Sequence, residues 1–234
     1  IRDPYVILGL VILGVLVLFA ISKMPDSKDI SSNDNVQETI KKLFKNNRYS
    51  TGVISQVLYV GAQIMCWTYI YQYAEAINID SVKAGYFQMI AFIVFFLGRA
   101  FGTYFLRFIN SGKLLMFYAI FAFVLMLGVI FIEGVIGLYF LVGVSFFMSV
   151  MFPTIYGISL GKLNNEESKI GSAGLVMAIV GGALMPKLQA TIIDIGGYAV
   201  NDIRFLGVSE INLSFILPAL CFIYIARYGL KNQN

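Results

Sequence analysis

The sequence predicts an all-α integral membrane protein. Of its 234 residues, 59% are hydrophobic and only 13% are charged, and the mean hydropathy is +0.80. A soluble domain could not cover so much apolar surface. Crossing the hydrocarbon core of a bilayer, about 30 Å thick, takes roughly 20 apolar residues of helix. Seven runs meet this length, at residues 4–22, 52–76, 84–108, 114–132, 136–160, 170–195 and 210–228.

The composition excludes several functional classes. The chain has no histidine, which removes histidine catalysis, histidine proton relays and the usual zinc sites. Cys66 and Cys221 lie in different apolar runs, where we expect packing thiols rather than a disulfide. We therefore expect no catalytic residues, no metal and no cofactor. Basic residues flank the membrane runs instead of forming a soluble patch, so we expect no nucleic-acid partner.

The breaks between runs carry turn residues, such as NIDSVK at 78–83 and INSGK at 109–113. Basic residues are retained in cytoplasmic loops, so their distribution predicts an N-terminus outside the membrane and a C-terminus in the cytoplasm. Additional spans upstream, five in number, would place both ends in the cytoplasm. Most basic residues share the predicted cytoplasmic side: Lys23, Lys28, Lys41, Lys42, Lys45, Arg48, Arg107, Lys113, Lys162, Lys169, Arg227 and Lys231.

The longest break, residues 23–50, falls on the predicted cytoplasmic side. It begins SKMPDSKDISSNDN and continues VQETIKKLFKNNRY, where Val36, Ile40, Leu43 and Phe44 form a short amphipathic face. This pattern favours a linker between two membrane bundles with a helix on the membrane surface, and an ordinary charged loop is the alternative. The predicted domains are the last helix of a preceding bundle at 1–22, the linker at 23–50, a six-helix bundle at 51–228 and a tail at 229–234.

The spans differ in polarity. Runs 4–22 and 114–132 are apolar all round and the run from 210 is almost as plain, so we expect these three to face lipid. The other four carry polar or helix-breaking residues at depth and should line an interior. Two inner spans for each outer span make a repeat of three, which predicts a bundle of two triplets.

The second span carries a polar stripe. Within GVISQVLYVGAQIMCWTYIYQYA (52–74), Gln56, Gln63, Trp67 and Tyr71 stand at spacings of seven, four and four, which places them on one helix face. Glutamine amides match sugar hydroxyls, and an indole offers a flat apolar face to a pyranose ring. These four residues are candidate sugar contacts, and hydrogen bonding between helices is the alternative.

Arg99 is a fifth candidate contact, about fifteen residues into the third span. An intramembrane Arg needs a polar or aqueous partner, so it could bind sugar or balance a carboxylate of another bundle. Snorkelling to the headgroups, or locking a closed state, remains the alternative.

Two prolines and one stripe of small residues predict helix geometry. Pro153 frees a backbone carbonyl in the fifth span and predicts a kink at a gate, together with Thr154. Pro186 predicts a second kink near the outer end of the sixth span. In the same span, Gly174, Ala178 and Gly182 stand four residues apart and predict close helix packing.

Several segments carry a family resemblance. They are the 52–74 stretch, GRAFGTYFL (98–106), FMSVMFPTIYGISLGKL (147–163), GSAGLVMAIVGGALMPKLQATIID (171–194) and FILPALCFIYIARYG (215–229). In order and spacing they resemble the C-terminal half of bacterial sugar permeases of the major facilitator superfamily, in the branch of L-fucose:proton symporters and glucose/galactose permeases. The resemblance implies twelve helices in two bundles, sugar bound between them, alternating access, and proton-coupling carboxylates in the first bundle.

The expected function is therefore proton-coupled uptake of a neutral monosaccharide across a bacterial inner membrane, with L-fucose preferred. Glucose/galactose or N-acetylglucosamine transport is the alternative within the family, and a non-transporting sugar sensor is the alternative of another class. An intramembrane enzyme would need a catalytic pair at depth, which the sequence lacks. The expected partners are the sugar, the proton, the lipid bilayer and the N-terminal bundle of the same transporter.

Overall fold

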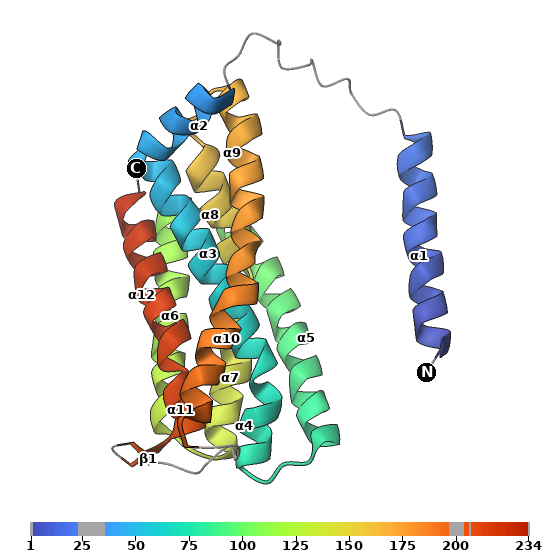
Figure 1. The fold of residues 1–234 in the computed structure, drawn as a ribbon, viewed down its shortest axis with the longest axis vertical. Helices are drawn as coiled ribbons and strands as arrows, with labels where there is room; N and C mark the ends of the chain where they lie inside the picture. The colour runs from blue at the N-terminus through green and yellow to red at the C-terminus, as the bar shows by residue number, and fades with distance from the viewer. Residues whose placement is uncertain (1, 23–35, 197–203, 206, 234) are drawn as a thin grey trace. The chain divides into compact units, whose positions relative to one another are not determined.

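The computed structural model describes residues 2–22, 36–196, 204–205 and 207–233. The chain forms two units, Ile1–Asp34 and Asn35–Asn234, which are described separately (Figure 1). The first unit holds α1 (Arg2–Ile21), an apolar helix of 20 residues. Its described side chains are exposed along the helix, so its surface needs lipid or other helices as neighbours.

Within its described residues, the second unit has six helical spans that are long and apolar enough to cross a membrane. The short helix α2 (Val36–Lys45) precedes the first span, α3 (Asn47–Thr68) with α4 (Ile70–Ala76). The next two spans are α5 (Ser81–Phe105) and α6 (Ser111–Phe131). The last three are α7 (Val135–Met148) with α8 (Met151–Leu160), α9 (Asn165–Met177) with η1 (Ala178–Val180) and α10 (Gly181–Ile193), and α11 (Glu210–Ser214) with α12 (Ile216–Lys231). Between the last two, η2 (Asp194–Gly196) is followed by β1 (Arg204–Phe205) and β2 (Val208–Ser209), an antiparallel pair.

Turn residues begin the helices by accepting hydrogen bonds from free backbone N–H groups. Asn46 accepts from two N–H groups at the start of α3. Asp80 accepts from the N–H of Lys83 at 2.9 Å, and Asn110 begins α6 in the same way. At α9, Asn164 and Glu167 form a reciprocal capping box. These caps fix where four of the six described spans begin.

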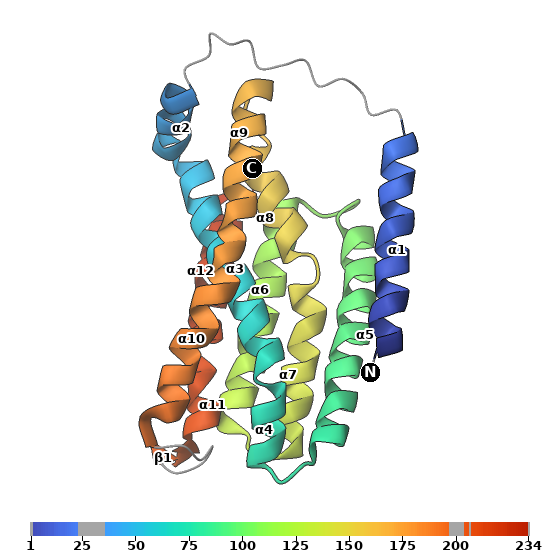
Figure 2. The ribbon, with the colours of Figure 1, turned by 45° about the vertical axis from the view of Figure 1, so that its right-hand side comes forward.

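Four of the six spans are interrupted, and proline accounts for three of the interruptions. Proline lacks an N–H and clashes with the preceding turn, so it breaks a helix a few residues upstream of itself. Pro153 follows the break between α7 and α8, which Figure 2 shows as a bend in the span. Pro186 follows the η1 turn, and Pro218 follows the break at Phe215. The break between α3 and α4 at Tyr69 has no proline.

The spans are unequally buried. α6 packs along α12, α10 along α3, and α5 along α7. The two plain spans expected to face lipid, α6 and α11–α12, have 44% and 50% of their apolar windows buried, against 17% for α5 and 22% for α9–α10. Plain helices can cover one another on one face and meet lipid with the other, so the expectation that these two spans face lipid stays a prediction. α5 and α9–α10 keep the largest uncovered surface.

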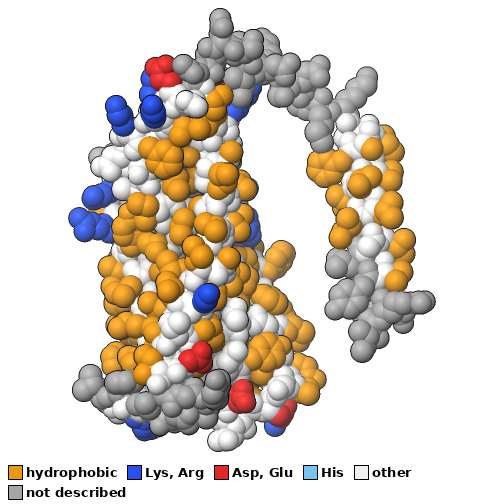
Figure 3. All heavy atoms as spheres, viewed as in Figure 1, with side chains coloured by type: hydrophobic (Ala, Val, Ile, Leu, Met, Phe, Trp, Pro, Cys, Tyr) orange, Lys and Arg blue, Asp and Glu red, His pale blue; other side chains and the backbone are white. Residues whose placement is uncertain are grey.

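Charges divide between the two ends of the second unit. Most Lys and Arg side chains visible in Figure 3 lie toward the end that holds α2, and most Asp and Glu side chains lie toward the opposite end. The basic end contains Lys41, Lys42, Lys45, Arg48, Arg107, Lys113, Lys162, Lys169, Arg227 and Lys231. The opposite end contains Glu75, Asp80, Glu133, Asp194 and Glu210, with Lys83 and Arg204.

The helix α2 lies at the basic end. Of its predicted apolar face, Leu43 is buried beside Tyr49 and Leu175, whereas Val36, Ile40 and Phe44 are exposed. Exposed apolar side chains next to lysines are typical of a helix that rests on a membrane surface.

Candidate functional site

Trp67 lies at the centre of an aromatic cluster between α3 and α5. Its indole N–H donates to Ser145 Oγ of α7 at 3.2 Å. The rings of Phe92 and Phe95 meet it edge-on, with centroid distances of 5.0 and 5.1 Å. We call Trp67, Phe92 and Phe95 the aromatic wall. Because a hydrogen bond holds its N–H and two phenylalanine rings pack roughly perpendicular to it, the indole has a fixed orientation.

The predicted polar stripe does not stay on one face. A step of about 100° per residue makes spacings of seven, four and four drift by roughly 60° from first to last. Gln56 is fully buried, Gln63 and Trp67 are half-buried, and Tyr71 is 44% exposed. The prediction of a single column is therefore wrong for Gln56, which lies inside the bundle. The helix break at Tyr69 separates Tyr71 from the others.

Gln56 has an unusual environment. Neither its amide nitrogen nor its amide oxygen has a hydrogen-bond partner among the described residues, although both atoms are buried. Leaving a buried polar group unpaired costs about 1–3 kcal/mol, and most such groups in proteins are paired. In this arrangement of the helices, the unpaired amide of Gln56 lowers the stability of the fold, and the side chain is not accessible to solvent.

A second stripe on α5 faces the first. Gln88, Phe92, Phe95 and Arg99 stand at spacings of four, three and four, which places them on one helix face. Two of them contact Trp67, so this face is directed toward α3. Of these four, only Arg99 is predicted from the sequence above, although the spacing that identifies the other three is also present there. Together the two stripes combine amide groups with an aromatic wall.

Arg99 is exposed and forms no ion pair with any carboxylate among the described residues. It lies close enough to Tyr59 of α3 to interact with it electrostatically. Tyr59 is fully buried and donates its own hydroxyl to the carbonyl of Met148 at 2.9 Å. The guanidinium is therefore open to a further partner.

The predicted kink residues lie at helix breaks, and their polar groups are satisfied locally. The Thr154 hydroxyl donates to the carbonyl of Val150 at 2.7 Å, next to Pro153. The carbonyl of Pro186 accepts a hydrogen bond from the Tyr69 hydroxyl at 2.8 Å. This bond joins the α3–α4 break to α10. Sequence reasoning missed Tyr69, because its partner is 117 residues away.

The small residues of α9 and α10 lie against α3. A side chain at Gly174 would meet the hydroxyl of Tyr49, and one at Gly182 would lie 3.0–3.2 Å from Ile64 and Val60. Ala178, between them, is buried. These positions let the two spans approach closely.

The described residues offer no metal chemistry. None of their His, Cys, Asp and Glu side chains form a group of three that could hold an ion. Both cysteines are buried and free.

No family model matches the chain, but related proteins do. It is 46% identical over 232 residues to an L-fucose-proton symporter of Haemophilus influenzae, covering 99% of this chain and 52% of that protein. It is 30% identical over 240 residues to a glucose/galactose transporter of Brucella abortus, covering 98% of this chain and 53% of that protein. The chain thus spans about half the length of the curated relatives that it matches.

One solved structure shares the fold along the whole chain. It is a crystal structure of a major facilitator superfamily transporter, FucP, in the outward conformation, with a TM-score of 0.81 and 29% identity. The match covers 100% of this chain and 55% of that one. With the six described spans, it confirms the predicted all-α, multi-pass membrane fold.

Proposed function

The chain is homologous to the C-terminal half of sugar transporters of the major facilitator superfamily, and from that premise we propose that it forms part of a proton-coupled importer of a neutral monosaccharide. L-Fucose is the preferred sugar. The relative named for L-fucose is 46% identical to this chain, whereas the relative named for glucose and galactose is 30% identical. Glucose or galactose is therefore the second candidate.

The aromatic wall is the observation that carries this proposal. A sugar ring has an apolar C–H face and a rim of hydroxyl groups, so a site for it combines an aromatic surface with orienting polar groups. Trp67 supplies the surface, and Gln63, four residues earlier on α3, supplies both a donor and an acceptor. We assign Gln63 and Trp67 as principal contacts, with Tyr71 and Arg99 at the edges and Gln56 engaged only if the helices rearrange.

Proton coupling needs a titratable group on the substrate path. The carboxylates of the described spans and their connections lie toward the two ends, with Glu166 and Glu167 at the start of α9 and Glu75, Asp194 and Glu210 toward the opposite end. None of them is among the residues that contact the aromatic wall. We therefore place the coupling groups in the N-terminal bundle. The uncovered surfaces of α5 and α9–α10 provide the face on which that bundle would pack, with residues 23–50 as the linker between bundles.

The charge distribution supports an orientation. Because the basic end holds most Lys and Arg, we place it in the cytoplasm and the start of α5 outside, in a bacterial inner membrane. Alternating access would then rock one bundle against the other, with the breaks beside Pro153 and Pro186 as points of flexure.

The test uses vesicles that contain the complete transporter. External pH is recorded after addition of L-fucose, D-galactose, D-glucose or N-acetylglucosamine. We expect alkalinisation with L-fucose, because protons enter with the sugar. If L-fucose gave no alkalinisation and one of the other sugars did, that other sugar would be the substrate. Sugar binding without flux or pH change would favour a sensor and contradict transport.

A further inference from the structure

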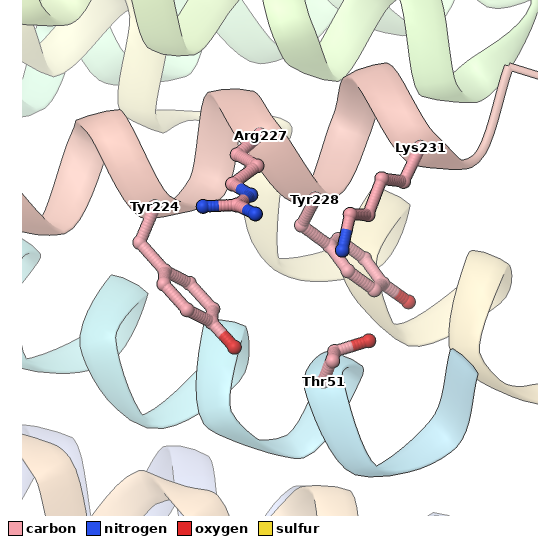
Figure 4. A pocket seen from close by; sticks show the side chains of 5 residues that line it. All are labelled: Thr51, Tyr224, Arg227, Tyr228 and Lys231. Carbon is pink, nitrogen blue, oxygen red and sulfur yellow. The ribbon is translucent and has the colours of Figure 1, made fainter. Parts of the chain in front are cut away.

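A basic pocket opens at the end of the second unit that holds α2. One part, of about 230 Å³, lies between α3 and α12, and Figure 4 shows side chains of α12 reaching toward Thr51 of α3. An adjoining part of about 430 Å³ shares Thr51 and Lys231 with it. The two parts together are lined by Asn47, Arg48, Thr51, Tyr224, Arg227, Tyr228, Lys231 and Asn232.

The lining carries three positive charges and no carboxylate. Arg48, Arg227 and Lys231 form no ion pair with any carboxylate in the part of the chain that the structure describes. Arg48 is held in place because its Nε donates to the carbonyl of Ile158 at 2.9 Å. Unpaired cations gathered at one place attract an anion, and guanidinium and ammonium groups both bind phosphate.

The hydroxyl groups of the pocket have distinct roles. Tyr228 is buried, and its hydroxyl contacts Ser159 Oγ at 2.9 Å and the carbonyl of Arg48 at 3.4 Å, so it forms part of the rigid wall. Thr51 donates its hydroxyl to the carbonyl of Asn47 at 2.6 Å. Tyr224 makes no hydrogen bond within the described residues, which leaves its hydroxyl available beside Arg227.

An exposed apolar stripe on α12 leads to this pocket. Ile216, Leu220 and Ile223 are 42–54% exposed, and with Arg227 they stand at spacings of four, three and four on one helix face. The eleven residues from Ile216 to Arg227 rise about 16 Å along a helix. Half of the hydrocarbon core of a bilayer is about 15 Å thick. The stripe therefore has the length of one lipid leaflet and ends at the cations.

We propose that the basic pocket binds the phosphate of an anionic phospholipid whose acyl chain lies along the α12 stripe. The stripe favours a lipid over a soluble phosphate, since a soluble anion would not use it. The excess of positive charge favours a lipid with net negative charge over a zwitterionic one, whose own ammonium would be repelled. This site is separate from the aromatic wall and does not depend on the transported sugar.

Native mass spectrometry of the purified complete transporter tests the proposal. Phosphatidylglycerol and phosphatidylcholine are titrated separately, and the retained lipid adducts give apparent affinities. The test variant is Arg227→Gln/Lys231→Gln. The matched control, Arg107→Gln/Lys113→Gln, removes the same charge from exposed positions at the same end of the unit. All four side chains are exposed, so both variants should fold.

We expect phosphatidylglycerol to bind more tightly than phosphatidylcholine, and the test variant to lose about fivefold in affinity per cation removed, roughly twenty-five-fold in all. The control should keep the preference. Equal losses of phosphatidylglycerol affinity in both variants would show that the lipid responds to the overall surface charge, and would contradict a specific site at the basic pocket. Displacement of phosphatidylglycerol by equimolar glycerol 3-phosphate would assign the pocket to a soluble phosphate and overturn the lipid.

Discussion

Trp67 is a strong candidate contact because its neighbours fix the orientation of its indole ring. Ser145 accepts a hydrogen bond from its N–H and two phenylalanine rings pack roughly perpendicular to the indole, so little rotational freedom remains to be lost when a sugar docks. Gln63 has no such anchor within the described residues and must be ordered by the sugar itself. At this scale, the site is one rigid surface beside one adaptable amide.

Truncating these two side chains should weaken sugar binding. In the complete transporter, Trp67→Ala removes the stacking surface and Gln63→Ala removes hydrogen bonds, and each loss is on the order of tenfold in affinity. Equilibrium dialysis with labelled L-fucose measures this. Phe117→Ala on the exposed face of α6 is the control for losing an exposed aromatic ring. Unchanged affinity in both site variants would sink the assignment.

A substitution at Gln56 should stabilise the protein instead of weakening it. Gln56→Leu replaces a buried amide that lacks partners with an apolar side chain of similar size, so the free energy of unfolding should rise by about 1 kcal/mol. Thermal unfolding in detergent should show an increase in Tm of about 3 °C. A lower Tm would mean that the amide is paired in the folded protein.

At the scale of elements, one hydrogen bond links two of the interrupted spans. The hydroxyl of Tyr69 bridges the one break that has no proline to the carbonyl of Pro186, next to another break. Tyr69→Phe removes only that bond, so we expect a loss of about 1 kcal/mol in stability and faster hydrogen exchange around Ile70. Tyr118→Phe is the control, because that hydroxyl makes no hydrogen bond within the described residues. Equal exchange in both variants would contradict the role of the bond.

The start of α5 should depend on pH. The N–H of Lys83, donating to Asp80, holds the pKa of that carboxyl below its usual value of 3.8. A lowered pKa means that the ionised cap stabilises the helix start above pH 4 and that this contribution is lost as pH falls through the folded pKa. The exchange rate of the Lys83 amide is measured in the native protein and in Asp80→Asn at the same pH. The ratio of the native rate to the variant rate should rise only in acid. A ratio that stays constant down to pH 2 would contradict the stabilising role of the ionised Asp80 cap.

Much of this architecture could be predicted from sequence, because span length, turn residues and prolines act locally. The break before Pro153 follows from proline chemistry alone. The position of Gln56 could not be predicted, because a drift of some tens of degrees decides between interior and surface. The contact of Trp67 with Phe92 and Phe95 depends on which helices become neighbours, which the pattern within one span does not show.

At the scale of the whole molecule, the orientation in the membrane can be tested directly. Both native cysteines are buried, so a membrane-impermeant maleimide should give little background. In intact cells Ser81→Cys should react, whereas Lys113→Cys, at the basic end, should react only after permeabilisation. Both positions are exposed. The reverse pattern would invert the proposed topology.

The contacts of α3 also set the order of events during synthesis. Its span has the lowest mean hydropathy of the six, 1.3, yet it is made first among them. The ribosome adds about 5–20 residues per second, so Ser145, 78 residues after Trp67, follows by roughly 4–16 seconds. Its other neighbours, α10 and α12, come later still. We therefore expect the nascent α3 to stay beside the insertion machinery until these partners arrive.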